Sequence, residues 1–152
     1  MKAAITGWGT ALPSARLDNR ELADRLDVSE EWIYQRTGIR SRRVVETETT
    51  TSLAIKTSTA AIEKAGISPE DIDLVVVATT TPEYQLPSTA SLLQSALGCR
   101  TAGAFDLNAA CSGFLYGLAL ANAAIESGAC RRVLVVPTAR YCVEDQGARE
   151  AQ

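Results

Sequence analysis

Cys111 is the residue whose type and setting best support covalent chemistry in this chain. Residues 102–107, just before it, form a short apolar run that predicts a buried strand. After it, apolar residues recur every three to four positions, the spacing of one helix face: Phe114, Leu118, Ala121 and Ile125. We therefore expect the thiol on a strand-to-helix turn, at or beside the N-terminus of a helix.

A thiol in that position could act as a nucleophile on a thioester. The free backbone N–H groups and the dipole at a helix N-terminus favour negative charge, and so favour the reactive thiolate form of cysteine. The same N–H groups could hold the oxyanion that develops on an attacked carbonyl. The alternative is an ordinary buried small residue, because cysteine is among the most buried types. Position and periodicity alone leave both interpretations open.

Trp32 and Arg36 form a second candidate site. They lie one turn apart on a helix predicted over residues 30–35 and capped by Ser29, so they share a helix face. An indole beside a guanidinium can stack on a flat heterocycle and contact phosphate. Alternatively, Trp32 packs the helix against the core while Arg36 makes an ion pair.

These segments together resemble the thiolase-fold condensing enzymes, and most of all β-ketoacyl-acyl-carrier-protein synthase III, the initiating enzyme of type II fatty acid synthesis. Two motifs carry the resemblance: Ala109-Ala-Cys111-Ser-Gly-Phe114 and Glu31-Trp32-Ile-Tyr-Gln-Arg36-Thr-Gly-Ile-Arg40. The likeness covers residues 2–136. Besides the two motifs, residues 75–80 resemble the family's central strand and following loop, 86–88 its pocket loop, and 127–136 its strand after the nucleophile helix. It implies that Cys111 is the nucleophile and that Trp32 and Arg36 hold the adenine end of coenzyme A. It also implies that Leu86 lines the acyl pocket of the partner in a homodimer.

The resemblance implies a two-stage reaction without a bound cofactor. Cys111 takes the acyl group from acyl-coenzyme A, and malonyl-acyl-carrier protein then loses carbon dioxide and attacks the acyl-enzyme to give a 3-oxoacyl product. Two positions affect how the substrates would be bound. Val28 stands where many relatives carry threonine, so one coenzyme A hydrogen bond is lost. Leu86 leaves the acyl chain open between acetyl and short branched groups.

The resemblance covers only the N-terminal half of the family's length. In the family, a histidine and an asparagine of the second half stabilise the enolate, whereas this sequence contains no histidine and stops at Gln152. We expect a half-enzyme over residues 1–140 with a divergent polar tail over 141–152, either a truncated or frameshifted product or part of a split enzyme completed by another chain. A non-catalytic fragment, a dimerising acyl-coenzyme A-binding module, and a polyketide or antibiotic-pathway relative stay open as alternatives.

Composition fits a cytoplasmic enzyme domain. The 152 residues are 46% hydrophobic, enough for one core, and 15 basic against 18 acidic residues give a net charge of −3, which offers no case for nucleic acid. Four cysteines without a C-x-x-C pair predict no zinc site, and the absence of a long apolar run predicts no membrane span. The arginines at 36, 40, 42 and 43 make a local basic cluster, either a solvated loop or a contact for acyl carrier protein or coenzyme A phosphates.

The order of predicted elements indicates an α/β fold. Strands are expected over 3–6, 74–78, 102–107 and 133–136, with helices over 19–26, 30–35, 52–64 and 88–97 and a further helix start at Ser68. This alternation predicts a mostly parallel sheet with helices on both faces, here one half of a thiolase-like fold. Gly7-Trp-Gly9 begins like a dinucleotide fingerprint, but Leu12 and Pro13 interrupt it, so we expect a tight turn there.

Overall fold

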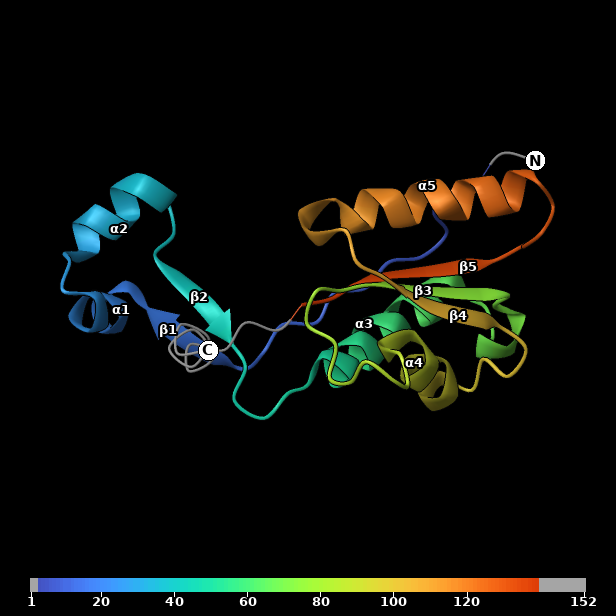
Figure 1. Cartoon of the computed structure of the whole chain (residues 1–152), viewed down its shortest axis with the longest axis horizontal. Coiled ribbons are helices and arrows are strands. Elements are labelled where there is room, and N and C mark those ends of the chain that lie inside the picture. Colours follow the sequence, from blue (N-terminus) through green and yellow to red (C-terminus); the bar gives the residue numbers. More distant parts are fainter. Residues whose placement is uncertain (1–2, 140–152) are drawn as a thin grey trace. The chain divides into compact units, whose positions relative to one another are not determined.

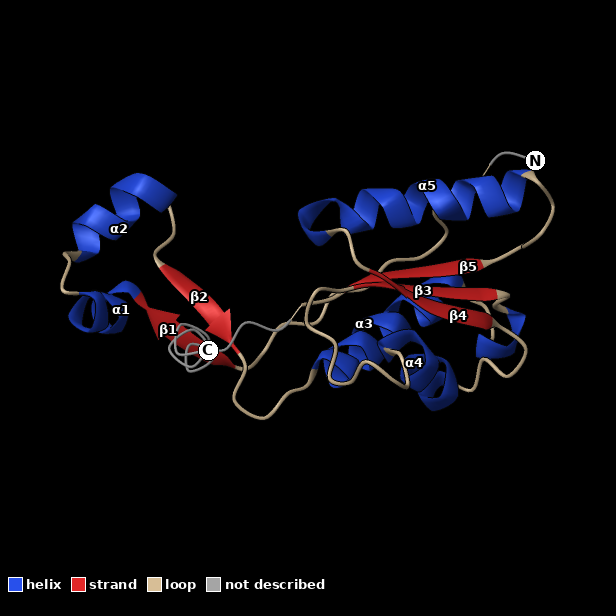
Figure 2. Cartoon of the chain, viewed as in Figure 1, coloured by secondary structure: helices blue, strands red, loops and turns tan. Residues whose placement is uncertain are grey.

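The computed structural model describes residues 3–139, and these form two compact units. The larger unit contains residues 3–11 and 49–139, and the smaller unit contains residues 12–48. Figure 1 labels the elements along the chain, and Figure 2 distinguishes helices from strands. The predicted polar tail over 141–152 lies outside the described residues.

A three-stranded parallel sheet lies at the centre of the larger unit. Its strands are β3 (Leu74–Ala78), β4 (Gly103–Leu107) and β5 (Val133–Pro137), in the order β4-β3-β5. Strand β3 takes the middle because its valines can be buried on both faces, and Val75, Val76 and Val77 are fully buried. The pairings align Ala78 with Leu107 and with Pro137, so all three strands end at the same edge.

Helices cover both faces of this sheet, which confirms the predicted fold class. Helices α3 (Thr50–Ala65) and α4 (Thr89–Leu97) lie on one face, and α5 (Gly113–Glu126) lies on the other (Figure 1). Thr49 and Ser52 form a capping box at the start of α3, and Gly66, with φ of 65°, ends it in the left-handed conformation. The expected helix at Ser68 is only a 3-10 turn, Pro69–Asp71.

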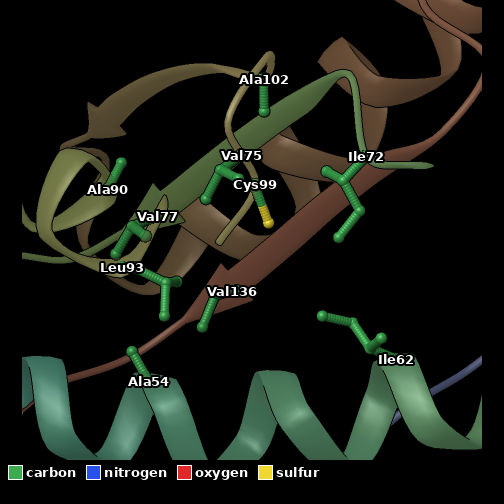
Figure 3. Packing of buried hydrophobic residues seen from close by; sticks show 10 residues of the cluster. All are labelled: Ala54, Ile62, Ile72, Val75, Val77, Ala90, Leu93, Cys99, Ala102 and Val136. Carbon is green, nitrogen blue, oxygen red and sulfur yellow. The ribbon is translucent and has the colours of Figure 1, made fainter. Parts of the chain in front are cut away.

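The hydrophobic core lies between the sheet and the pair α3 and α4. Figure 3 shows its buried side chains pointing toward one another from β3, β5 and both helices. They are Ala54, Ile62, Ile72, Val75, Val77, Ala90, Leu93, Cys99, Ala102 and Val136. Burial raises the pKa of the Cys99 thiol, because the charged thiolate would lose its hydration there. Cys99 is therefore a core residue.

Helix α5 contacts the sheet mainly through small residues, and of the apolar stripe that the sequence predicts only Ala121 is fully among them. Gly113, Gly117 and Ala121 are its buried residues, whereas Phe114 is 42% exposed. A Cβ atom added to Gly117 would lie 2.7 Å from Cγ1 of Val135, closer than packed carbon atoms come. In the predicted stripe, Ala121 is buried, Leu118 and Ile125 are half-buried and Phe114 is exposed. Small residues one turn apart let the helix approach the sheet more closely than large side chains would.

The N-terminal segment also differs from the prediction. Residues 3–6 have no regular secondary structure and pair with no strand of the described sheet, and Gly7 and Gly9 form no turn. A Cβ atom on Gly7 would lie 2.2 Å from the carbonyl oxygen of Ala61, and one on Gly9 would lie 2.3 Å from that of Thr57. The two glycines therefore serve a close approach of the chain to α3.

The smaller unit combines two helices with an antiparallel strand pair that the sequence does not predict. Its elements are β1 (Ala15–Asp18), α1 (Asn19–Leu26), α2 (Glu30–Thr37) and β2 (Ser41–Val44), with Arg16 paired to Arg43. Arg42 donates to Oδ1 of Asn19 at 2.9 Å, and Arg43 donates to the Ser14 carbonyl at 2.8 Å. These two members of the basic cluster therefore hold β2 to the start of α1 and to the residue before β1.

Two carboxylates, half-buried Glu48 and exposed Asp73, hold loops by accepting hydrogen bonds from the backbone. The Glu48 carboxylate accepts a hydrogen bond from the backbone N–H of Ser14 at 3.0 Å. It also accepts from the backbone N–H groups of Glu46 and of Glu48 itself, and together these bonds lower the pKa of Glu48 to about 2. Asp73 accepts from the N–H groups of Arg132 and Arg131 at 2.9 and 2.7 Å, which lowers its pKa. Asp73 thus fastens the entry of β5 to the start of β3.

Within residues 3–139, no helix combines the length and apolar character needed to span a bilayer. The same residues contain no group of three or more histidine, cysteine or carboxylate side chains arranged to bind a metal ion.

Candidate active site

Cys111 lies on the turn that joins β4 to α5. It is the middle residue of a 3-10 turn, Ala110–Ser112, and α5 begins two residues later at Gly113. The thiol-bearing residue is exposed. The predicted position, on a strand-to-helix turn beside a helix N-terminus, is therefore the one that the structure has, and the alternative of a buried small residue does not apply.

The residue before the thiol has an unusual backbone. Ala110 has a φ of 45°, and it is one of two non-glycine residues with positive φ among the described residues. A non-glycine residue in this region is disfavoured by its own Cβ, so surrounding contacts must hold it there. On the next turn, Gly113 approaches β3 so closely that an added Cβ would lie 3.0 Å from that of Ala78. This contact fixes the start of α5 against the sheet.

Leu86 lies on the loop between β3 and α4, and its side chain is 87% exposed. The loop over 79–88 and the turn over 108–112 leave neighbouring strands at the same edge of the sheet (Figure 1). Ligand sites of parallel α/β sheets form at the carboxyl ends of the strands, where such loops meet. The structure thus brings the segments of Leu86 and Cys111 to one edge.

The two ends of the Leu86 loop are fastened to different elements. On the β3 side, Thr50 Oγ1 donates to the Thr81 carbonyl at 2.8 Å, and the Thr51 N–H donates to Glu83 at 2.7 Å, so α3 holds the loop. On the α4 side, Asp106 of β4 accepts from the N–H groups of Thr89 and Ala90 at 2.9 and 2.7 Å. Sequence reasoning missed Asp106, although a carboxylate inside an otherwise apolar strand was the available signal.

Trp32 and Arg36 are in contact on α2 of the smaller unit. The guanidinium carbon of Arg36 lies 4.2 Å from the centroid of the Trp32 ring, and Trp32 is 45% exposed. The Ser29 hydroxyl caps the helix by accepting from the Trp32 N–H at 3.0 Å. A second cation–π pair lies nearby, where the guanidinium carbon of Arg40, beyond the end of α2, is 4.4 Å from the centroid of the Tyr34 ring. The predicted shared face is confirmed, and Trp32 keeps an accessible ring.

A cavity of about 460 Å³ in the larger unit is separate from the thiol. It lies between residues 3–9, α3, α5 and β5, and its lining includes Phe114 and Leu118 but not Cys111. The helix face predicted to be buried therefore borders this cavity.

The parallel sheet between two helical layers, with a cysteine on a strained strand-to-helix turn, fits one half of a thiolase-like fold. A family profile described as 3-oxoacyl-acyl-carrier-protein (ACP) synthase III matches residues 105–143. The beta-ketoacyl-acyl-carrier-protein synthase III of Erythrobacter litoralis is 50% identical over 137 residues, which are 90% of this chain and 43% of that protein.

Solved structures give the same result. The 3-oxoacyl-acyl-carrier-protein synthase III of Aquifex aeolicus superposes with a TM-score of 0.86 and 43% identity, over 90% of this chain and 44% of that one. The priming β-ketosynthase of the R1128 polyketide pathway superposes with a TM-score of 0.87 and 44% identity, over 90% of this chain and 41% of that one. The predicted resemblance is confirmed: the chain is similar to a β-ketoacyl-acyl-carrier-protein synthase III, and it spans less than half the length of these relatives.

Proposed function

We propose that this chain is the nucleophile-bearing half of a synthase III-type acyltransferase that condenses acyl-coenzyme A with malonyl-acyl-carrier protein. The observation that carries the proposal is the exposed Cys111, which follows a left-handed Ala110 at the entrance of α5. An exposed thiol at that point can reach a thioester, and nearby backbone N–H groups can stabilise the oxyanion. The acyl group passes from coenzyme A to Cys111, and the coenzyme A thiolate leaves.

The remaining parts of the proposal concern substrates and partners. Trp32 and Arg36 bind the adenine end of coenzyme A, and Leu86 lines an acyl pocket in a homodimer. The reaction uses coenzyme A thioesters as substrates and no separate cofactor, and it takes place in the cytoplasm. The donors for the malonyl enolate come from a second half, because this sequence has no histidine.

Complementation tests the assignment of Cys111. The 152-residue chain is mixed with a separately produced C-terminal remainder of the Erythrobacter litoralis relative, and acetyl-coenzyme A and malonyl-acyl-carrier protein are added. We expect an acetyl adduct on Cys111 by peptide mass and a 3-oxoacyl product in the mixture, with no condensation and little adduct from the chain alone. Cys111→Ala should abolish both products, because the neighbouring Ser112 hydroxyl is a far weaker nucleophile than a thiol without a base to activate it.

The matched control is Cys130→Ala, which removes another thiol outside the buried core and should leave both products unchanged. Absence of an adduct in the mixture, while iodoacetamide still labels Cys111, would contradict the enzymatic proposal and favour the non-catalytic binding module. Comparing acetyl-coenzyme A with short branched acyl-coenzyme A in the same mixture identifies the acyl chain that the sequence leaves open.

A second experiment tests the coenzyme A site. Trp32→Ala should weaken coenzyme A binding about tenfold by titration calorimetry, because loss of a stacked ring and its cation–π partner costs roughly 1–2 kcal/mol. Tyr34→Ala is the control, since Tyr34 lies on the same helix and the substitution removes its cation–π pair with Arg40, which lies beyond the helix end. Equal weakening by the two variants would argue against a specific role for Trp32.

A further inference from the structure

A row of unpaired backbone groups runs along the outer edge of β5. The strand order β4-β3-β5 leaves this edge without a partner strand within residues 3–139. The Thr138 N–H, one residue beyond β5, donates to the Ala78 carbonyl at 3.0 Å, and β5 runs parallel to β3 in unbroken register. Because the polar groups of successive strand residues point to opposite sides, those of Val133 and Val135 point away from β3. The edge of β5 is therefore an open template for another strand.

The segment over residues 3–9 has unpaired backbone groups as well. None of its N–H and C=O groups makes a hydrogen bond within the part of the chain that the structure describes. The segment is nonetheless held in place, because Gly7 and Gly9 lie directly against the backbone of α3. Ile5 in this segment is 74% exposed although its side chain is apolar. Both its backbone and its apolar surface can therefore accept a partner.

The cavity of about 460 Å³ lies between β5 and residues 3–9, and we call it the strand slot. Its two walls differ in chemistry. The wall from α5 is formed mainly by large apolar side chains, Phe114, Leu118 and Ile125. The wall from α3 is formed by small side chains, Thr57, Ser58 and Ala61. A strand in the slot would pair with the backbone on either side and turn alternate side chains to the two walls.

Ser58 adds a requirement for a polar group on the α3 side. The residue is 1% exposed, and its hydroxyl has no hydrogen-bond partner within the described residues. A buried hydroxyl without a partner is costly, so an occupant that supplies one is favoured. The side chains that face α5 should therefore be apolar, and those that face α3 should be small, with a polar group within reach of Ser58.

An extended polypeptide suits the strand slot, because backbone groups line both of its long sides. The chain's own residues 140–152 do not match the apolar walls, since they include Glu144, Asp145, Arg149 and Glu150. Longer relatives have ample chain to supply a strand. The present chain covers 44% of the Aquifex aeolicus synthase III, so more than half of that protein lies outside the matched part.

We propose that the strand slot takes a β-strand from the polypeptide that supplies the second half of the enzyme, with apolar residues facing α5 and small residues facing α3. This inference rests on the proposed function, which requires such a polypeptide. The added strand bonds to Val133 and Val135 on one side and to residues 3–9 on the other, and it joins them into one sheet. Backbone pairing inside the larger unit thus holds the two polypeptides together.

Site-resolved amide hydrogen exchange of the whole 152-residue chain tests this docking. The probe is the separately produced C-terminal remainder of the Erythrobacter litoralis relative, added in excess. We expect exchange at Val133 and Val135 to slow about tenfold or more, because their amides gain partners. Leu134 and Val136 are the internal reference, since their N–H groups face β3 and are protected before the remainder is added.

A synthetic peptide tests the strand slot without the rest of the partner. The peptide has about seven residues of alternating valine and alanine, the length of an ordinary strand, with a lysine at each end and blocked termini. We expect it to protect the same two valine amides of β5, with lower affinity than the remainder. A control peptide with N-methylated valines should give no protection, because it lacks the N–H groups that face one side of the slot.

Two lysine variants test the α5 wall. Phe114 lines the slot and is 42% exposed in the chain alone, so Phe114→Lys should leave the chain folded and weaken peptide binding about fivefold or more. Leu115→Lys is the matched control, since the neighbouring Leu115 is 66% exposed and does not line the slot. It should change the affinity less than about twofold.

Unprotected Val133 and Val135 amides with both the remainder and the peptide would overturn the proposal. Equal protection by the N-methylated peptide, or equal weakening by the two lysine variants, would also overturn it. Protection that rises with the concentration of the unmixed chain would assign the slot to a second copy. Protection that disappears when residues 140–152 are deleted would assign it to the chain's own tail. Either assignment contradicts the proposal.

The same mixtures separate this inference from the proposed function. An acetyl adduct on Cys111 with unprotected Val133 and Val135 amides would contradict the docking alone. Protected amides without an adduct would contradict acyl transfer alone, because the exchange measurement needs no reaction at the thiol.

Discussion

Gly117→Leu is expected to lower the free energy of unfolding by about 3 kcal/mol and to abolish acyl transfer in the complemented mixture. An added Cβ at this position would lie 2.7 Å from Cγ1 of Val135 and 4.0 Å from that of Val76, and the leucine has three further carbons to place. The β-branched valines cannot move away easily, because they form the sheet and pack on both faces. Helix α5 must therefore shift outward.

The functional loss follows from the position of Cys111 at the entrance of that helix. Gly113, two residues after the thiol, lies against Ala78, so an outward shift of α5 breaks the contact that fixes the turn. Leucine has a higher intrinsic helix propensity than glycine by roughly 0.5–1 kcal/mol, so a net loss of stability must come from this contact.

Urea denaturation of the chain measures the change in stability. Ala119→Leu is the matched control, because Ala119 is an exposed residue of the same helix, and it should change stability by less than about 0.5 kcal/mol. A stable Gly117→Leu chain that still forms the Cys111 adduct would show that α5 does not depend on close approach to the sheet.

Leu93→Ala should destabilise the larger unit by about 3 kcal/mol. Leu93 is fully buried on α4, and Figure 3 shows it pointing toward Val136 and Ala54 in the core. Removal of three buried carbons loses their transfer free energy and leaves a cavity, and such changes typically cost roughly 2–5 kcal/mol. Because α4 carries the end of the Leu86 loop, its loosening should also raise hydrogen exchange at the first residues of the helix.

The control is Leu115→Ala, the same chemical change at a site on α5 that is 66% exposed. It should cost less than about 0.5 kcal/mol in the same urea titration. Similar losses in the two variants would mean that the core described between α3, α4 and the sheet does not stabilise the chain.

The larger unit shows how far local signals can predict structure. The run of valines in β3 and the serine before α4 each specify their element locally, through burial on two faces and through a side-chain cap. The same holds for Cys111, since an apolar strand followed by a helical pattern leaves only a short turn between them. The cysteine position was therefore predictable from the neighbours it has in the chain.

The strands β1 and β2 were not predictable in this way. Their sequences are short and charged, and their pairing places Arg16 opposite Arg43 and Leu17 opposite Arg42. Apolar and charged residues alternate over the four residues of β1, which is too short a run to indicate a strand, and β2 shows no such alternation. The pair forms because contacts distant in sequence satisfy its side chains, as when Arg42 donates to Asn19.

By itself, the sequence determined the order of the α/β elements over residues 50–137, the turn that carries Cys111, and the shared helix face of Trp32 and Arg36. Tertiary structure decided which face of α5 is buried, why Gly7 and Gly9 are glycines, and that Asp106 links α4 to β4. The physical reason is the range of the interactions involved. Caps, turns and periodicity act between near neighbours in the chain, whereas close backbone approach and a carboxylate between two elements exist only once distant segments have packed together.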